Sequence, residues 1–261
     1  MLQVTSTGLS ICRYVIAVAA FVVPASIAVS ANAGYLYVGA ADNTTTTGAN
    51  VNLPINAQTV SNALTDEHSL FEMSMSNMSG SSGNIIEIGV TTDIGLNGDM
   101  NPHWFVFSWI NGTGQGYDAN SHFVSQIGSF WTTSLASAEG TSAEVSFQYS
   151  SSNWWLYLNG TAAGYFPESE WSGAFTASSV TQVFGEVYYD GAFYPTMNGA
   201  VSGYSSSGGG NLSSRYSYSP YVQSNASQTG FTASGPVPEP SNVVLIGIAV
   251  SAFALRRRAR S

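Results

Sequence analysis

From His68 onward, short apolar runs alternate with turn-forming residues along most of the chain. The runs are rich in β-branched and aromatic residues, which are enriched in strands. The clearest predicted strands cover 85–90, 103–110, 143–149, 154–158, 162–166 and 181–189. No useful stretch of the body carries the stripe of an amphipathic helix. The pattern predicts one all-β domain, most simply an antiparallel β-sandwich of two packed sheets.

Two Asn-Gly pairs mark predicted hairpin turns. They are Asn111-Gly112, after the predicted strand 103–110, and Asn159-Gly160, between the predicted strands 154–158 and 162–166. Both central positions of a type I′ turn need a positive φ, which Asn and Gly tolerate best. We therefore expect two-residue hairpins at both places.

The flanks of this domain are less strongly patterned. Residues 34–66 form a lead-in rich in Thr, Asn and Ala, with weak strands at most, and residues 67–204 form the predicted core. Residues 205–236 are rich in Ser, Gly and Tyr, which predicts a loop and a tail only partly packed on the core.

Both ends of the chain carry targeting signals. Residues 1–33 contain Arg13, then an apolar run, and then the small-residue pattern Ala31-Asn32-Ala33. This order predicts a secretory signal that signal peptidase removes. Residues 237–261 combine Val237-Pro238-Glu239-Pro240, a short apolar run and an arginine block. A retained N-terminal anchor and a plain C-terminal tail anchor remain the alternatives.

This C-terminal order resembles the PEP-CTERM sorting signal of Gram-negative bacteria. The resemblance implies a short transmembrane segment, transient anchoring in the inner membrane and recognition by an exosortase. It also implies delivery to the outer surface or the extracellular matrix. The membrane is then a partner only until the tail has been processed.

Charge and composition exclude several function classes. The chain of 261 residues has fifteen acidic residues, six arginines and no lysine, and between Gly34 and Gly235 the net charge is −13. Nucleic acid is therefore excluded as a partner. The only cysteine, Cys12, lies in the predicted signal, so the body has no disulfide or thiol chemistry. Because metal-ligand spacings and phosphate-binding loops are absent from the sequence, we expect neither a metal nor a cofactor.

Two glutamates have surroundings that are unusual for a solvated charge. Glu87 lies within Ile85-Ile86-Glu87-Ile88-Gly89-Val90, and Glu186 within Val183-Phe184-Gly185-Glu186-Val187-Tyr188. Strand alternation places each carboxyl on a face lined by aromatic or small residues. Desolvation there would raise a carboxyl pKa, which suits acid–base chemistry. The alternative is an ordinary polar position on a half-exposed strand.

Two blocks of the sequence resemble the neprosin family, and together they span roughly Glu67 to Tyr204. The first block runs from Asn84 to Asp99 and continues with Pro102-His103-Trp104-Phe105-Val106-Phe107. The second contains Asn153-Trp154-Trp155-Leu156, Gly164-Tyr165-Phe166-Pro167-Glu168-Ser169, Val183-Phe184-Gly185-Glu186-Val187 and Pro195-Thr196-Met197-Asn198-Gly199. The chain departs from the family at Val90, where a Trp usually stands.

The resemblance implies a glutamic peptidase: a β-sandwich whose shallow cleft holds two catalytic glutamates and which cuts peptides at proline in acid. Carried over by motif, the two residues are Glu87 and Glu186. Which of them is the base stays open, since such a pair titrates as a unit. Gln182, on the face of Glu186, is the candidate for orienting water or stabilising the oxyanion. The candidate groove-lining residues are Trp154, Trp155, Tyr165 and Tyr188.

A second hypothesis comes from a different class of protein. The same sandwich could be a non-catalytic protein of the cell surface or extracellular matrix that binds polysaccharide or protein. An enzyme needs both carboxyls in one cleft, whereas carboxyls on separate faces would favour the binding protein. The position of the two glutamates therefore discriminates between the hypotheses.

Overall fold

The computed structural model describes residues 34–60, 67–79, 82–116, 120–189 and 194–236. The predicted signal, the predicted sorting segment and their targeting helices lie outside these residues. Within the described part, no helix is long and apolar enough to cross a membrane.

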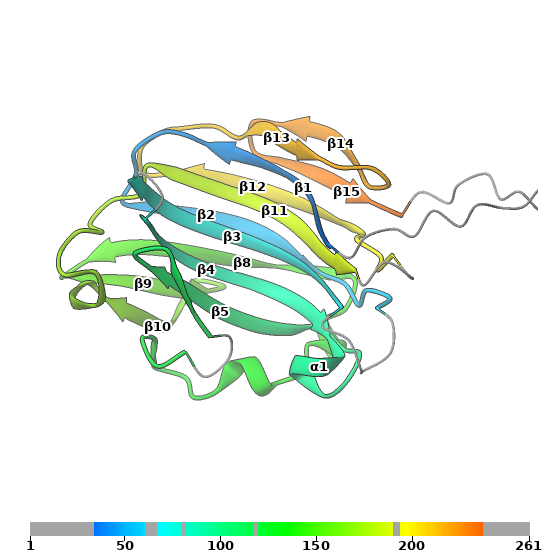
Figure 1. The fold of residues 1–261 in the computed structure, drawn as a ribbon, viewed down its shortest axis with the longest axis horizontal. Helices are drawn as coiled ribbons and strands as arrows, with labels where there is room; N and C mark the ends of the chain where they lie inside the picture. The colour runs from blue at the N-terminus through cyan, green and yellow to red at the C-terminus, as the bar shows by residue number, and fades with distance from the viewer. Residues whose placement is uncertain (1–33, 61–66, 80–81, 117–119, 190–193, 237–261) are drawn as a thin grey trace, which may run out of the picture. The chain divides into compact units, whose positions relative to one another are not determined.

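Two antiparallel sheets make up the domain (Figure 1). The seven-stranded sheet has the order β13(Ser213–Ser217), β1(Gly34–Asp42), β11(Val180–Tyr189), β3(His68–Ser79), β4(Ser82–Asp93), β5(His103–Ile110) and β6(Thr113–Gln115). The eight-stranded sheet has the order β14(Val222–Ser227), β15(Gly230–Ser234), β12(Gly199–Ser206), β2(Gly48–Ile55), β8(Thr141–Ser150), β9(Asn153–Leu158), β10(Thr161–Pro167) and β7(Val124–Ser125). The described helices are short: α1(Ile94–Asn97) and the 3₁₀ turns η1(Phe130–Thr132), η2(Ala136–Ala138) and η3(Glu168–Trp171).

The predicted β-sandwich is confirmed, and each of the six predicted strands corresponds to an observed one. The two hairpin turns also have the expected backbone. Asn111 and Gly112 have φ of 51° and 79°, and Asn159 and Gly160 have φ of 48° and 75°. These positive values are what a type I′ turn requires.

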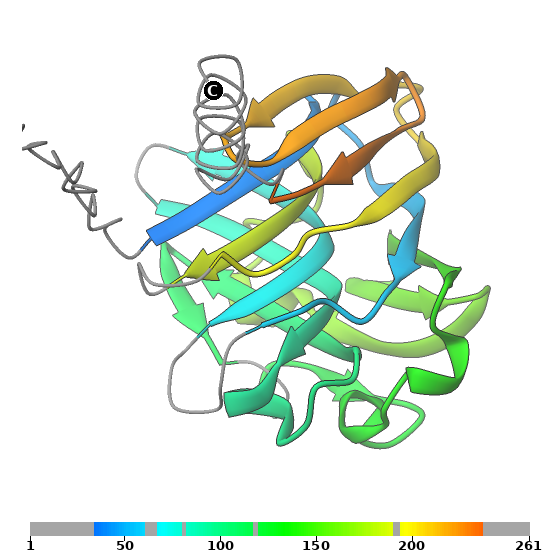
Figure 2. The same cartoon turned by 90° about the vertical axis from the view of Figure 1, so that its right-hand side faces the viewer.

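The two flanking segments are more ordered than the sequence pattern indicates. The lead-in supplies β1 and β2, one to each sheet, and β1 pairs with β11 along its whole length. The Ser/Gly/Tyr-rich segment supplies β13, β14 and β15, which lie together at one end of the sandwich (Figures 1 and 2). Long-range pairing with an existing sheet edge supplies the hydrogen bonds that local propensity does not predict.

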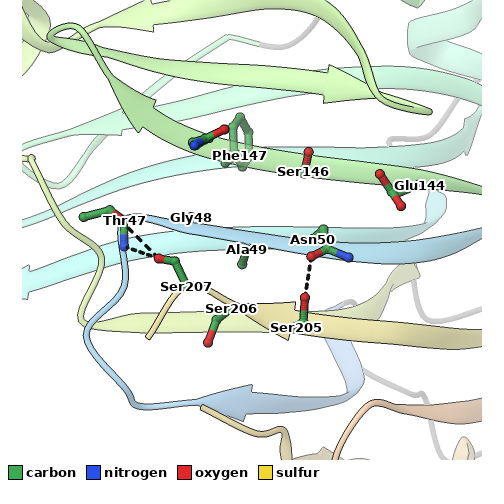
Figure 3. Close-up of a pocket in the computed structure, with 11 residues that line it drawn as sticks. Thr47, Gly48, Ala49, Asn50, Glu144, Ser146, Phe147, Ser205, Ser206 and Ser207 are labelled. Atoms are coloured by element: carbon green, nitrogen blue, oxygen red, sulfur yellow. Dashed lines mark hydrogen bonds between the residues drawn. The ribbon is translucent and has the colours of Figure 1, made fainter. Parts of the chain in front are cut away.

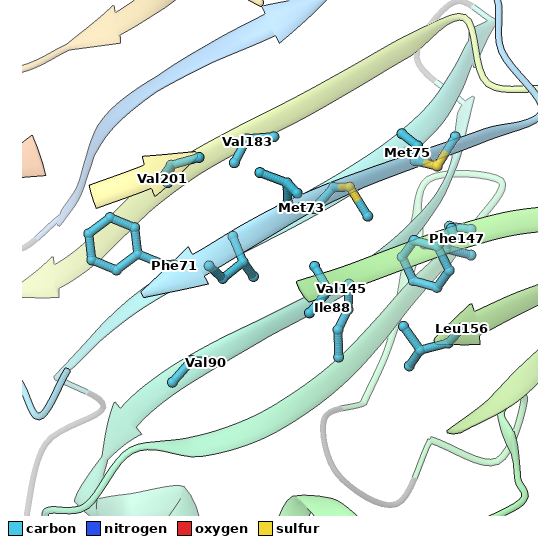
Figure 4. Packing of buried hydrophobic residues seen from close by; sticks show 14 of the residues in the cluster. Phe71, Met73, Met75, Ile88, Val90, Val145, Phe147, Leu156, Val183 and Val201 are labelled. Atoms are coloured by element: carbon cyan, nitrogen blue, oxygen red, sulfur yellow. The ribbon is translucent and has the colours of Figure 1, made fainter. Parts of the chain in front are cut away.

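The core lies between the sheets. Figure 4 shows Met73 and Ile88 of the seven-stranded sheet packing with Val145 and Phe147 of the eight-stranded sheet, and all four are almost fully buried. Burial of such a side chain contributes roughly 1.5–3 kcal/mol. Because successive residues of a strand point to opposite faces, the neighbours of these core residues point outward.

The outward face of the seven-stranded sheet carries a second, smaller set of buried apolar residues. Leu70, Phe105 and Phe184 are 2%, 0% and 8% exposed but do not belong to the core between the sheets. They alternate with the core residues Phe71, Trp104 and Val183. This face therefore has an apolar floor of its own.

Candidate active site

A cleft of about 700 Å³ lies on this outward face of the seven-stranded sheet. Six adjacent strands, β13, β1, β11, β3, β4 and β5, contribute its walls. The lining residues are Tyr35, Tyr37, Glu72, Ile85, Glu87, Phe107, Trp109, Gln182, Phe184, Glu186, Tyr216 and Tyr218. The cleft thus contains three carboxyl groups among mostly aromatic side chains.

Strand register determines how the three glutamates are arranged. Glu72 lies on β3, between Phe184 of β11 and Gly89 of β4. On β11, Glu186 is two residues from Phe184, toward one end of β3. On β4, Glu87 is two residues from Gly89, toward the opposite end of β3. Diagonal neighbours of this kind have Cα atoms about 7–8 Å apart, within reach of long side chains. Glu72 therefore lies midway between the two predicted catalytic residues.

Glu87 is held in a strongly desolvating environment. Burial, and then the charge of Glu186, raise the pKa of Glu87 from 4.5 to about 8. A hydrogen bond from the Trp109 side chain opposes this rise, because it favours the ionised form. Desolvation dominates, so the Glu87 carboxyl is protonated in acid and at neutral pH.

Glu186 has polar partners that Glu87 lacks. Its Oε1 lies 3.0 Å from Nε2 of His68, and only 12% of the His68 side chain and 14% of the Glu186 side chain are exposed. The Tyr37 hydroxyl also donates a hydrogen bond to Glu186. Burial and the neighbouring charge of Glu186 together raise the pKa of Tyr37 far above its usual range. Tyr37 therefore remains a neutral donor.

Glu72 is the most enclosed of the three, with 4% of its surface exposed. Burial, and then the charges of Glu87 and Glu186, raise its pKa well above the usual value. A buried carboxylate without a cationic partner is costly, so the neutral acid is favoured.

Gln182 has a fixed orientation. Its Oε1 accepts a hydrogen bond of 2.6 Å from the Tyr216 hydroxyl. The amide N–H₂ group is therefore free to serve as a donor within the cleft. Tyr216 is itself packed in a cluster of rings with Tyr37, Phe184 and Tyr218, at centroid distances of 5.9, 6.3 and 6.5 Å.

None of the four predicted groove-lining residues is among those that line this cleft, and three of them belong to the other sheet. Trp154 is fully buried in the core, where its Nε1 donates to the Phe175 carbonyl at 2.6 Å. Trp155 and Tyr165 pair across β9 and β10 on the outward face of the eight-stranded sheet. Tyr188 does share the face of Glu186, where its ring stacks 6.0 Å from His68. Strand alternation predicts on which side of its strand a residue points, but it does not predict to which sheet that strand belongs.

A second hollow, of about 450 Å³, lies on the eight-stranded sheet (Figure 3). Its floor is polar: Ser205 donates to Asn50 at 2.5 Å, and the Thr47 amide donates to Ser207 at 3.1 Å. Glu144 is the only titratable residue among those that line it. A pair of carboxyls is therefore found in the first cleft and not in this one.

Sequence reasoning missed several cleft residues. Glu72 satisfies the criterion that identified Glu87, since it lies within the apolar sequence Leu70-Phe71-Glu72-Met73. His68 and Trp109 gave no comparable signal, because only strand pairing brings them beside the two glutamates. Among the described residues, no group of three or more His, Cys, Asp or Glu side chains is arranged to hold a metal ion.

A sequence model of the Neprosin family matches residues 65–230, well over half of the chain. Among solved structures, scytalido-glutamic peptidase with a transition state analog inhibitor is similar with a TM-score of 0.50 and 12% identity, over 78% of this chain and 99% of that chain. SCP-B, a member of the Eqolisin family of peptidases, has a TM-score of 0.44 and 12% identity over the same shares. CG-16, an agglutinin from chicken liver, has a TM-score of 0.30 and 13% identity over 62% of this chain and 99% of that chain. At 12% identity, the likeness to scytalido-glutamic peptidase shows a shared fold.

Proposed function

The chain belongs to the Neprosin family and is a glutamic-type peptidase, and from this premise we propose that Glu87 and Glu186 form its acid–base pair. The observation that carries the proposal is the single cleft that both side chains line. An acid–base pair needs two groups held in different protonation states close to one substrate bond. The surroundings of the two glutamates differ in this sense.

Glu186 is the general base. His68 Nε2 and the Tyr37 hydroxyl are hydrogen-bond partners of its carboxylate and hold it at the wall of the cleft. The ionised Glu186 takes a proton from a water molecule as that water attacks the carbonyl carbon of the scissile peptide bond. The proton remains on Glu186 while the tetrahedral intermediate forms.

Glu87 is the general acid. Its pKa of about 8 keeps it protonated in acid and at neutral pH. The neutral carboxyl donates a hydrogen bond to the carbonyl oxygen and then protonates the leaving nitrogen, so that the C–N bond breaks. The amide of Gln182, fixed by Tyr216, donates a second hydrogen bond to the oxyanion.

The substrate is a peptide that crosses the strands of the sheet. Tyrosine rings from β1 and β13 line one end of the cleft, and Phe107 and Trp109 line the other. Flat aromatic faces pack well on the ring of proline, which supports a preference for proline beside the cleaved bond. Cleavage at proline is the finer part of this proposal.

The test is cleavage of matched peptides with and without proline by the purified protein and by its Glu87→Gln and Glu186→Gln variants. Both variants should be folded and should lose activity by roughly 10³-fold or more. Wild-type activity should fall as the pH rises through about 8, where Glu87 ionises. Full activity in either folded variant would exclude the pair.

Export is a further part of the proposal. The apolar segment and Ala31-Asn32-Ala33 support cleavage before Gly34, and the segment 237–261 supports processing by an exosortase. The mature enzyme then acts at the outer surface or in the extracellular matrix of a Gram-negative bacterium. Mass spectrometry of the native protein should find Gly34 as its first residue and should lack the arginine block. An intact chain in the cytoplasm would contradict this.

A further inference from the structure

Glu72 is a carboxyl group in the cleft that the acid–base mechanism does not use. It lies on β3, the strand between β11, which carries the base, and β4, which carries the acid. Its register neighbours on the same face are Phe184 and Gly89, neither of which has a polar side chain. The two proposed catalytic groups are its diagonal neighbours, one on either side.

The titratable groups that face Glu72 come from β11 and β4, which pair with β3, and from β1, which lies beyond β11. They are Glu186 from β11, Glu87 from β4 and Tyr37 from β1, and each interacts with it electrostatically. His68, on the same strand, has its Nε2 directed to Glu186. β5 contributes the apolar ring of Phe105 beside Gly89. His68 is thus already paired with Glu186.

A third negative charge at this position would have large consequences. It would repel the ionised base and would oppose ionisation of the acid, because Glu72 itself is almost fully buried and its charge would be poorly screened by water. A neutral carboxylic acid instead offers one O–H donor and one carbonyl acceptor to the two carboxyl groups that flank it. Such a group can hold both in a fixed geometry over the sheet.

We propose that Glu72 is a positioning residue of the active site, a neutral carboxylic acid that hydrogen-bonds to the flanking glutamate side chains and holds them in place. This inference rests on the proposed function of Glu87 and Glu186. Glu72 touches neither the water nor the peptide bond; it acts through its two neighbours. Activity then requires that Glu72 remain protonated, and its ionisation contributes to the loss of activity at high pH.

Two substitutions separate this role from the alternatives. Glu72→Gln keeps the volume, one donor and one acceptor but cannot ionise, so kcat at the pH optimum should stay within about threefold of wild type. The alkaline limb of log kcat/KM should become less steep, from a slope approaching two to a slope of one. Glu72→Leu keeps the volume without hydrogen bonds and should lower kcat about 100-fold with little change in KM. Glu144→Gln, on the other sheet, is the matched control.

Several outcomes would overturn the proposal. A Gln variant as inactive as Glu87→Gln would make Glu72 itself an acid–base group. A Leu variant with wild-type kcat and pH profile would show that the Glu72 side chain contributes only its volume. Both variants should be shown to unfold at temperatures near that of wild type.

A measurement that does not depend on activity separates this proposal from the function it rests on. In protein with ¹³C-labelled glutamate carboxyls, NMR near pH 6, about two units above an ordinary glutamate pKa, should show two protonated carboxyl groups. One of these signals should disappear in Glu72→Gln. If Glu72 is ionised at that pH, the proposal fails even if peptides are cleaved. If Glu87→Gln and Glu186→Gln remain active, the proposed function fails whatever the NMR shows.

Discussion

Nε2 of His68 lies 3.0 Å from Oε1 of Glu186, and the two side chains are almost enclosed by the cleft. The His68 ring packs against two tyrosine rings, with centroids 6.1 Å from Tyr35 and 6.0 Å from Tyr188. This contact gives Glu186, the proposed base, a polar partner that Glu87 does not share.

Replacing His68 by Phe should lower kcat/KM. Phe keeps a ring against Tyr35 and Tyr188 but has no nitrogen to hydrogen-bond to the Glu186 carboxylate. A hydrogen bond to a charged group contributes about 1.5–3 kcal/mol, so a loss of about tenfold or more is expected. Initial rates on the same peptides would measure it. An unchanged kcat/KM would show that His68 has only a packing role.

Replacing Trp109 by Phe should extend activity to higher pH. The Trp109 side chain donates to Glu87 and so lowers its pKa against the larger effect of burial. Without that donor the pKa of Glu87 rises further, and the general acid stays protonated over a wider range. The alkaline limb of kcat/KM should move up by about half a unit to one unit. A shift to lower pH would contradict the assignment of Glu87 as the acid.

Folding stability should decrease as the pH rises from 4.5 to 8. The folded-state pKa of Glu87, about 8, lies above its ordinary value of 4.5. The native state therefore keeps a proton that the unfolded chain loses between these values, and the associated stability is complete below 4.5. A few kcal/mol should be lost across this window, as measured by urea unfolding.

Glu87→Gln is the variant that tests this origin. It removes one titrating group and should flatten the dependence of unfolding free energy on pH, although Glu72 contributes in the same direction. Glu144→Gln should keep the wild-type dependence, since Glu144 is exposed on the other sheet. Parallel curves for wild type and Glu87→Gln would show that the buried carboxyl is not the cause.

Replacing Gly89 by Ala should lower the folding stability, because the added methyl group would clash with residues at the floor of the cleft. An added Cβ would lie 2.3 Å from Cε1 of Phe105 and 2.6 Å from the Phe71 carbonyl oxygen. Phe105 is fully buried and cannot move away freely, so about 1–3 kcal/mol of stability should be lost. Thermal unfolding would measure this. Gly34→Ala, where nothing lies within 4 Å of the added atom, should be neutral.

Replacing Trp155 or Tyr165 by Ala should leave peptide cleavage within about twofold of wild type. Both residues lie on the outward face of the eight-stranded sheet, on strands that contribute nothing to the cleft. Steady-state kinetics on the same peptides would measure the effect. A large rise in KM would show that substrate also contacts that sheet.

Local sequence patterns were sufficient for six strands of the core domain, but they did not single out β3 or β12. The alternation in 181–189 predicted both the strand and the face that carries Glu186, because a strand repeats every two residues. The Asn-Gly pairs predicted two turns, because few residues accept positive φ. Strands β1 and β13 were harder to predict. Their hydrogen bonds come from pairing with distant parts of the chain, so local sequence does not identify them reliably.

The sequence by itself determined the β-sandwich, the two apolar-flanked glutamates and the family to which they belong. Only the tertiary structure decided that Glu72 lies between those glutamates, that His68 and Trp109 contact them, and that Trp155 lies elsewhere. The reason is physical. Alternation depends on neighbours within a strand, whereas the composition of a cleft depends on which strands pair and in which register.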